Sequence, residues 1–383
     1  MRKLIRLTTV PLSLQYLLRG QPRHMSAFFE VLCVSSGPAT DLGEVAKREG
    51  VKVREVKMTR QITPFKDLKS VWELYKLFKK EKPSIVHSHT PKAGIVGMLA
   101  ARFAGVPQRL HTAAGLPLME ATGIKRLILN VVEKAIYRCA TMVYPNSKGL
   151  CDFILAEAFA PRQKIKVLAN GSSNGINTAY FSPVLVSEKQ ISALRAQHDI
   201  QPADFVFVFV GRLVSDKGIN ELVTAFKKLG TPHIKLLLVG HYEHELDPLA
   251  LGTHAVIKDH PDIITTGFQT DVRPYFALSS ALVFPSYREG FPNVVLQAGA
   301  MGLPNIVTDI NGCNEIITDD FNGIIIPVKN SESIYKAMKL LLEDNRLYKK
   351  LKNNSRKCIV DKYEQQLVCE AILGEYKSLE SHV

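Results

Sequence analysis

The sequence lacks three patterns that identify common enzyme classes. No GxGxxG motif follows the first apolar segment, the dipeptide Gly-Lys does not occur, and HExxH is absent. These absences exclude the standard dinucleotide-binding fingerprint, P-loop nucleotide triphosphatases and zinc proteases of the HExxH type. An enzyme with this sequence must therefore use another kind of ligand site.

Cysteines are few, and long apolar runs are absent. The six cysteines are scattered without a CxxC pair, which argues against a zinc site or a disulfide framework and suits a reducing cytosol. No apolar run approaches the ~18 residues that a membrane-spanning helix needs. Arg6 interrupts the first apolar stretch, so we interpret that stretch as a strand and not as a signal peptide. We expect a cytoplasmic protein.

Acidic residues are scarce in the first half of the chain. Residues 1–180 contain 28 lysines and arginines against 12 aspartates and glutamates, a balance of +16, whereas residues 181–383 carry −3. This asymmetry indicates that one domain faces an anionic partner, either a lipid surface or nucleic acid. A solvated basic face without any partner remains an alternative.

Short apolar runs alternate with amphipathic segments through the first half, which predicts a doubly wound parallel sheet. We expect strands at Leu4–Thr9, Phe28–Val34, Val51–Val56, Ser84–His87, Arg109–Thr112, Thr141–Tyr144 and Lys164–Leu168. We expect helices at Leu42–Arg48, Asp67–Lys80, Ala93–Ala104, Lys125–Arg138 and Lys148–Ala158.

A Gly-, Ser- and Asn-rich stretch near residue 171 reads as a linker, and the alternation restarts near Gln201. Strands are expected at Phe205–Val210, Ile234–Val239, Ile263–Thr266, Ala281–Phe284, Asn305–Thr308 and Gly323–Ile326. Helices are expected at Gly218–Leu229, Asp271–Leu278, Asn293–Met301, Ser331–Leu342 and about Arg346–Val360. We therefore predict two α/β domains, residues 1–180 and 181–360, that face a central cleft. A final helix in residues 361–383 is expected to pack back on the first domain.

The stretch from Ser286 to Ala298 carries the clearest functional pattern. Glu289 and Gly290 lie on a loop between an expected buried strand and an expected helix, and Pro292 suits the first helical turn. Free N–H groups at a helix start favour an anion such as phosphate. The stretch thus predicts a phosphate site beside a carboxylate, although an ordinary loop with a solvent-facing glutamate is the alternative.

Two cations occupy a second loop at the same predicted edge of the sheet. Arg212 and Lys217 follow the strand that ends at Val210. Fixed cations there would neutralise a diphosphate and the negative charge that develops as it leaves. The alternative is ordinary surface charge, but a lysine near a helix start is mildly unfavourable, which supports the functional interpretation.

The first domain has a comparable loop that contains His87, His89 and Lys92, and His111 ends the next expected strand. A His-x-His pair can bind a metal, but no carboxylate or cysteine cluster completes a ligand set. We prefer contacts to a substrate hydroxyl or phosphate, with structural histidines as the alternative.

The expected helix from Gly123 to Arg138 mixes cations with large aliphatic residues. Such a helix either lies on a membrane surface or is a core helix whose cations extend to solvent. Both interpretations stay open.

Taken with their spacing, these motifs resemble retaining glycosyltransferases of family 4, which have the GT-B fold of two Rossmann-like domains. The resemblance rests on Gly211-Arg212-Leu213, Lys217-Gly218 and Glu289-Gly290-Phe291-Pro292, supported by Thr308, Gly312, Glu315 and Asn322-Gly323. The loop from His87 to Gly94 is similar to a branch that builds bacterial capsule, O-antigen or exopolysaccharide units.

The resemblance implies a role for each group of residues. Arg212 and Lys217 would bind the donor diphosphate, and Glu289 would contact the transferred sugar. The histidine of the family's first-domain loop falls at Ala114 here, so either a neighbour, His111 or His89, would serve in the catalytic set, or the contact would be lost. The acceptor, a saccharide on a polyprenyl diphosphate, would bind through His87, His89 and Lys92, and no metal or other cofactor is implied. The remaining donor-binding residues would be Gly211, Gly267, Phe268, Gly290, Phe291, Pro292, Asn293 and Gln297, with the nucleotide base near Gly267 and Phe268.

The sequence departs from the family pattern at three places. Gln297 stands where a second glutamate usually binds the nucleotide ribose, and Ala114 occupies the usual place of a histidine. The Gly-Gly turn after the first strand is replaced by Thr9-Val10-Pro11. We expect a metal-independent retaining transferase of a hexose or N-acetylhexosamine, with a UDP-sugar as donor, at the inner face of the plasma membrane.

Two other functions fit the same features less well. A nucleotide-sugar 2-epimerase would act on the donor alone, and a weakened nucleotide-sugar-binding or partner protein would account for Gln297 and Ala114. A nucleic-acid binder is not expected, because no nucleic-acid-binding module is evident.

Overall fold

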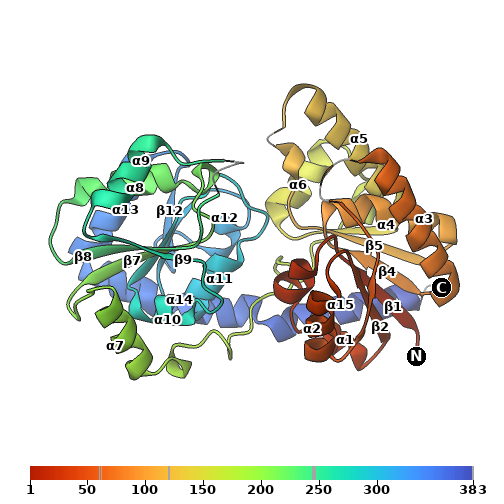
Figure 1. Ribbon diagram of the computed structural model, residues 1–383, viewed down its shortest axis with the longest axis horizontal. Coiled ribbons are helices and arrows are strands. Elements are labelled where there is room, and N and C mark those ends of the chain that lie inside the picture. The colour runs from red at the N-terminus through yellow and green to blue at the C-terminus, as the bar shows by residue number, and fades with distance from the viewer. Residues whose placement is uncertain (60, 62, 120, 244–246, 382–383) are drawn as a thin grey trace. The chain divides into compact units, whose positions relative to one another are not determined.

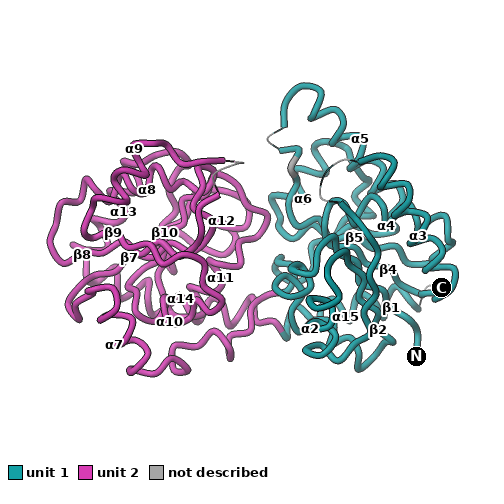
Figure 2. The backbone as a smooth tube through the Cα atoms, in the orientation of Figure 1, with its two compact units in different colours: residues 1–174, 366–383 teal, residues 175–365 magenta. Residues whose placement is uncertain are grey.

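The computed structural model describes residues 1–59, 61, 63–119, 121–243 and 247–381. The chain forms two compact units (Figure 2). Unit 1 contains residues 1–174 and 366–383, and unit 2 contains residues 175–365. The division falls close to residues 180 and 360, where the sequence suggested domain boundaries.

Unit 1 is built on a six-stranded sheet of order β3-β2-β1-β4-β5-β6, in which every pairing is parallel. Its strands are β1 (Lys3–Leu7), β2 (Glu30–Ser35), β3 (Lys52–Glu55), β4 (Ile85–Ser88), β5 (Gln108–Ala113) and β6 (Met142–Pro145). Its helices are α1 (Gln21–Ser26), α2 (Ala39–Glu49), α3 (Pro64–Glu81), α4 (Pro91–Ala104), α5 (Gly123–Cys139), α6 (Lys148–Ala156) and α15 (Gln365–Glu380).

Helices cover both faces of this sheet (Figure 1). Helix α4 packs against both α3 and α5, and together they bury one apolar core. The other face is buried by a separate cluster that includes Leu42 of α2 and Val368 of α15. The C-terminal helix α15 is therefore part of unit 1, where Tyr376 bonds to Arg6 at 2.5 Å.

Unit 2 repeats the plan with a second parallel sheet of order β12-β11-β10-β7-β8-β9. Its strands are β7 (Phe205–Val210), β8 (Ile234–Val239), β9 (Ile263–Gly267), β10 (Ala281–Phe284), β11 (Asn305–Thr308) and β12 (Gly323–Ile326). Its helices are α7 (Glu188–Gln197), α8 (Ile219–Leu229), α9 (Leu251–Asp259), α10 (Arg273–Leu278), α11 (Asn293–Ala300), α12 (Cys313–Ile316), α13 (Ser331–Glu343) and α14 (Asn345–Tyr363).

The strands of unit 2 are continuous apolar runs because both faces of their sheet are covered. In β7 the sequence Phe-Val-Phe-Val-Phe-Val has its four central residues buried. A strand in a parallel sheet that is covered on both faces has a continuous apolar sequence. It lacks the alternation of apolar and polar residues that is typical of a half-exposed strand. The fold class predicted from the sequence is confirmed.

One expected strand, Lys164–Leu168, is wrong. The chain forms a 3-10 turn at Arg162–Lys164 and then pairs with the edge strand β6 at a single bridge between Ile165 and Val143. Ile165 and Leu168 are buried, whereas Lys166 is exposed and Lys164 turns its ammonium group to the Tyr137 carbonyl oxygen at 3.1 Å. A single bridge to β6 does not extend the sheet by a strand.

Candidate active site

The two motif loops of unit 2 lie side by side at the carboxyl edge of its sheet. One loop follows β7 and the other follows β10, and these strands are hydrogen-bonded neighbours. The backbone confirms the contact between loops, because Tyr287 N–H donates to Asp216 C=O at 2.8 Å. Ligands of open α/β sheets bind at this edge.

Close packing at this edge depends on glycine at two positions, one on the loop after β7 and one on the loop after β11. Gly218 has φ of +71°, and a Cβ atom there would lie 2.1 Å from the carbonyl oxygen of Pro285. A Cβ atom on Gly312 would lie 2.7 Å from the carbonyl oxygen of Gly290. Any larger residue would force the loops apart.

Lys217 and Glu289 form an ion pair at the centre of this site. Their side chains are 15% and 19% exposed, so both are largely shielded yet still accessible. Ser286 is fully buried beneath them, with Oγ 3.1 Å from Glu289 Oε1 and 3.5 Å from Lys217 Nζ. The serine therefore holds the carboxylate and the ammonium group against each other.

The neighbouring cations are paired as well. Arg212 contacts Glu243, and its side chain is 46% exposed. Arg288 bonds to Asp216 Oδ2 at 3.0 Å. Guanidinium and ammonium groups thus gather at one edge, and each is held in place by a carboxylate.

The start of α11 offers unpaired backbone donors next to Glu289. The N–H groups of Gly290, Phe291, Asn293 and Val294 donate to no acceptor among the residues that the structure describes. Pro292 is the N-cap residue and supplies no side-chain acceptor. This geometry suits an anion or sugar hydroxyl groups.

The other expected donor-binding residues lie on the ends of adjoining strands or on α11. Gly211 follows β7 and donates its N–H to Val239 C=O at 2.9 Å, while Gly267 ends β9. Phe268 is 61% exposed, and its ring lies 6.2 Å from that of His241. Gln297, on α11, is half-buried. All of these positions belong to unit 2.

The histidines expected on the acceptor side are buried inside unit 1. His87 bonds to Tyr376 Oη at 2.6 Å and to Thr112 Oγ1 at 2.8 Å. His89, 1% exposed, has no hydrogen-bond partner on either ring nitrogen among the described residues. Lys92 forms an ion pair with Asp67 at 2.5 Å. The rings of His87 and His89 are covered by protein, and the Lys92 ammonium group is already paired with a carboxylate. These three side chains therefore do not suit direct recognition of a substrate.

His111 is likewise enclosed, which does not suit the catalytic contact expected for it. Its Nδ1 atom lies 2.8 Å from Ser88 Oγ, and the ring packs against Gly94. Burial lowers the pKa of His111 to about 3 and lowers the pKa of both His87 and His89 well below 6.5. These three rings are therefore neutral near pH 7, and in this structure they pack and hold loops.

Several residues of the site carried no recognisable signal in the sequence. Glu243 and Asp216 pair with Arg212 and Arg288, and no motif or fixed spacing marks either pairing. Ser286 lies within the motif stretch, but its place beneath the ion pair depends on which strands are neighbours.

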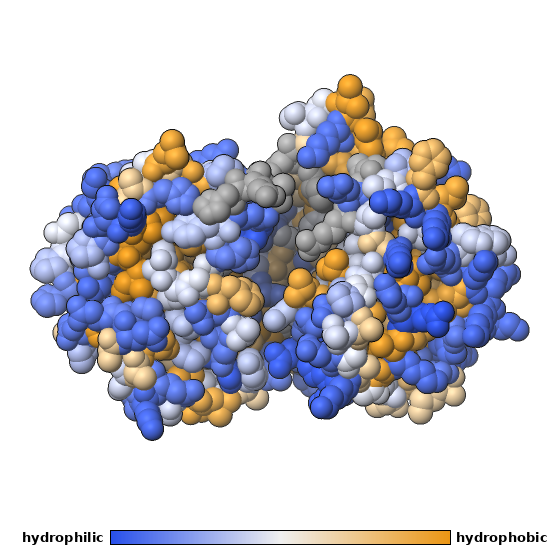
Figure 3. Space-filling model, viewed as in Figure 1, coloured by the Kyte–Doolittle hydropathy of each residue, from blue (hydrophilic) through white to orange (hydrophobic). Residues whose placement is uncertain are grey.

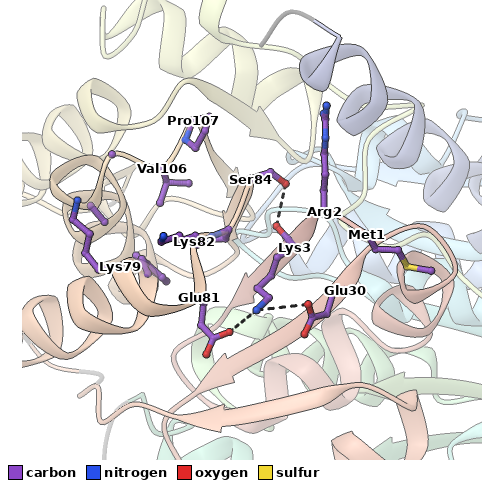
Figure 4. A pocket seen from close by; sticks show the side chains of 14 residues that line it. Met1, Arg2, Lys3, Glu30, Lys79, Glu81, Lys82, Ser84, Val106 and Pro107 are labelled. Carbon is purple, nitrogen blue, oxygen red and sulfur yellow. Dashed lines mark hydrogen bonds and ion pairs between the residues drawn. The ribbon is translucent and has the colours of Figure 1, made fainter.

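No group of three potential metal ligands occurs among the described residues. Within the same residues, no helix is both long and apolar enough to cross a membrane. A hollow of about 710 Å³ lies in unit 1, around the amino ends of β1 and β4 (Figure 4). Lys3 points there toward Glu81 and Glu30, and none of the expected site residues lines the hollow.

Comparisons with known proteins agree with this architecture. Residues 190–358 match the family described as "Glycosyl transferases group 1", and residues 14–171 match "Glycosyl transferase 4-like domain". The chain is 32% identical to the capsular polysaccharide biosynthesis glycosyltransferase CapM of Staphylococcus aureus, over 98% of this chain and 97% of that protein. It is 30% identical to an Escherichia coli enzyme named UDP-Gal:alpha-D-GlcNAc-diphosphoundecaprenol alpha-1,3-galactosyltransferase, over 86% and 84% of the two chains.

Solved structures share the fold at lower sequence identity. A glycosyltransferase from Rickettsia africae superposes with a TM-score of 0.82 at 19% identity and covers 100% of both chains. Anabaena HepE, crystallised with UDP and glucose, gives a TM-score of 0.81 at 17% identity over 99% of this chain and 100% of its own. The two-sheet architecture is the GT-B fold.

Proposed function

The chain belongs to the group 1 glycosyl transferases, and from this premise we propose that it transfers a sugar from a nucleotide sugar to a lipid-linked saccharide acceptor in surface polysaccharide synthesis. The relatives in capsule synthesis and in sugar transfer to diphosphoundecaprenol acceptors support this assignment. We propose a UDP-sugar as donor, which the UDP-bound HepE supports at the level of fold.

The observation that carries the proposal is the cluster at the carboxyl edge of the unit 2 sheet. Lys217, Glu289 and the free amides at the start of α11 lie together, with Arg212 on the same loop as Lys217. Cations and amides are the groups that bind a diphosphate, and a carboxylate accepts hydrogen bonds from sugar hydroxyls. The edge thus presents groups for both halves of a nucleotide sugar.

We assign roles to these groups as follows. Lys217 and Arg212 bind the two phosphates and stabilise the charge that develops as the bond from the anomeric carbon to the diphosphate oxygen breaks. Glu289 and the amides of Gly290 and Asn293 orient the sugar. An acceptor hydroxyl attacks from the face that the diphosphate leaves, which retains the anomeric configuration, and its proton passes to the leaving diphosphate. The cations supply the charge stabilisation that a metal ion provides in other transferases.

The acceptor is proposed to reach unit 1, which we place at the inner face of the plasma membrane. Helix α5 exposes Ile124, Leu127, Ile128 and Val131, with exposed fractions of 78%, 65%, 44% and 68%. The spacing puts these side chains on one stripe of the helix, and hydrophobic atoms gather over α5 in Figure 3. An apolar stripe on a basic unit is typical of a helix that lies on an anionic lipid surface.

The decisive experiment is a transfer assay with purified protein, a panel of UDP- and GDP-sugars, and undecaprenyl-diphosphate-linked sugars as acceptors. We expect release of nucleoside diphosphate and a lengthened acceptor with one donor, with or without EDTA. NMR of the product establishes the anomeric configuration. Interconversion of the donor without acceptor would instead identify an epimerase.

Lys217→Ala tests the proposed donor site. We expect a loss of turnover of at least about 100-fold, because the leaving diphosphate loses its most shielded cation. Lys339→Ala, on the exposed face of α13, is the control and should keep full activity. Unchanged turnover in Lys217→Ala would remove this residue from the mechanism.

A further inference from the structure

We propose that Glu289 also weakens the binding of the free nucleoside diphosphate, so that the site discriminates the sugar donor from its own product. The proposal rests on the donor site assigned above and adds a specificity role for a residue there. Its basis is the arrangement of charges around Lys217.

The ammonium group of Lys217 is already bound by the Glu289 carboxylate. Ser286 Oγ lies 3.1 Å from Glu289 Oε1, and the serine is fully buried, so the carboxylate is held in place and cannot easily turn away. A phosphate oxygen that binds Lys217 must therefore replace this carboxylate or share the ammonium group with it. In either arrangement the two anions lie close together.

For a free diphosphate this arrangement is doubly unfavourable. The carboxylate loses part of its ion pair, and it faces another negative charge in a site that is shielded from water. A bare diphosphate has no sugar hydroxyl groups that could donate hydrogen bonds to the carboxylate in return. The affinity of the site for nucleoside diphosphate is therefore lowered by Glu289.

A nucleotide sugar changes this balance, because its hydroxyl groups are hydrogen-bond donors. A carboxylate that gives up Lys217 then accepts bonds from the sugar and stays satisfied. The same side chain thus supports the donor and opposes the product. Once the sugar has left, the carboxylate competes again for Lys217 and favours release of the diphosphate.

The other cations show the same local neutrality. Arg212 contacts Glu243, and Arg288 contacts Asp216. Each of these three cations, Lys217 included, therefore contacts a carboxylate among the described residues, so none of them offers its full positive charge to a bare anion. A bare anion must compete with a carboxylate for each of them, which agrees with selection through the sugar.

The test is titration calorimetry with Glu289→Gln, which keeps the shape of the side chain and removes its charge. The probes are UDP, GDP, ADP, inorganic diphosphate and the matching nucleotide sugars. We expect UDP and inorganic diphosphate to bind the variant about tenfold tighter, while the nucleotide sugar gains less or binds more weakly. Glu343→Gln, an exposed glutamate of α13, is the control and should leave all affinities unchanged.

The outcomes separate this proposal from the proposed function. If the wild-type protein binds a nucleoside diphosphate and Glu289→Gln binds it equally or more weakly, the proposed role of Glu289 is overturned. The donor site itself is then unaffected. An equal gain for diphosphate and nucleotide sugar would also overturn it, because discrimination would be lost. Wild-type protein that binds none of the probes would overturn the donor site itself. Glu289→Ala removes the same charge and serves as the second variant if Glu289→Gln does not fold.

Discussion

At the residue scale, the centre of the site depends on a side chain that takes no part in the proposed chemistry. Ser286 is buried, and its Oγ lies within 3.5 Å of Lys217 Nζ, of Glu289 Oε1 and of the carbonyl oxygen of Arg288. The serine hydroxyl fixes the Glu289 carboxylate in the position from which it is proposed to accept a hydrogen bond from a sugar hydroxyl. We infer that Ser286 positions the catalytic groups without contacting the substrate itself.

Ser286→Ala should therefore lower kcat by about tenfold, because a misplaced carboxylate and ammonium group stabilise the transition state less well. KM for the donor should change by less than about threefold, since the cations and amides remain. Ser355→Ala is a matched control: Ser355 is equally buried in unit 2, and its hydrogen-bond partners within the described part of the chain are the backbone carbonyls of Asn322 and Leu351. Equal kinetic loss in both variants would show a general effect on folding instead.

The sequence predicted Lys217 and Glu289 as site residues, but it could not predict that they touch. Their contact depends on β10 lying next to β7, an order that the chain reaches only through long crossovers. The sequence also could not predict the burial of His87, His89 and His111. A histidine near the end of a strand gives the same sequence pattern whether its ring faces solvent or the core. Residue type and spacing predict chemistry, whereas exposure depends on the packing of distant elements.

At the element scale, α5 carries an acidic residue on its buried side. Glu133 is 3% exposed, and burial raises its pKa to about 7 from an ordinary 4.5, with the neighbouring Tyr137 hydroxyl opposing part of the rise. The folded protein thus holds this proton more tightly than the unfolded chain does. Between pH 4.5 and 7 the unfolded state binds fewer protons, so stability falls as pH rises.

Glu133→Gln should remove this dependence. We expect equal stability of variant and wild type near pH 4.5, and a variant that is more stable by about 3 kcal/mol at pH 8, from a shift of roughly 2.5 pH units. Urea unfolding at the two pH values measures the difference. An identical difference at both values would indicate a packing effect and not a titrating carboxyl group.

The elements that the sequence predicted best are those whose pattern is set by burial. All six expected strands of unit 2 are confirmed, five of them with identical bounds, because a doubly covered sheet requires continuous apolar runs. The pattern does not predict helix α7 because none of its residues is fully buried, and Ile191 and Leu194 alone pack partly buried against the core among its large apolar residues. Helix α9 was missed because it buries only Thr253 and Ile257. A helix with so few core contacts leaves little periodicity to detect.

At the scale of the whole molecule, the two halves of the chain differ in charge. The +16 of residues 1–180 belongs almost entirely to unit 1, while residues 181–383 carry −3. Attraction to an anionic bilayer would therefore act mainly on unit 1, and unit 2 would stay accessible to a soluble donor. Charge alone gives weak, salt-sensitive binding, so stable attachment needs an apolar contribution as well.

The stripe on α5 supplies that contribution in our proposal, and it can be removed without touching the core. We expect wild-type protein to float with vesicles of 70% phosphatidylcholine and 30% phosphatidylglycerol, and to bind pure phosphatidylcholine poorly. The triple variant Ile124→Ser, Leu127→Ser, Val131→Ser should bind the anionic vesicles at least about tenfold more weakly, because less apolar surface leaves water. Val184→Ser, a single change at an 86% exposed residue of unit 2, controls for general surface polarity and should bind as wild type does.

Transfer to a short water-soluble acceptor should stay unchanged in the triple variant, whereas transfer to a vesicle-bound acceptor should fall with binding. Full vesicle binding by the triple variant would exclude α5 as the lipid-facing element and leave the basic charge of unit 1 as the remaining source of attraction.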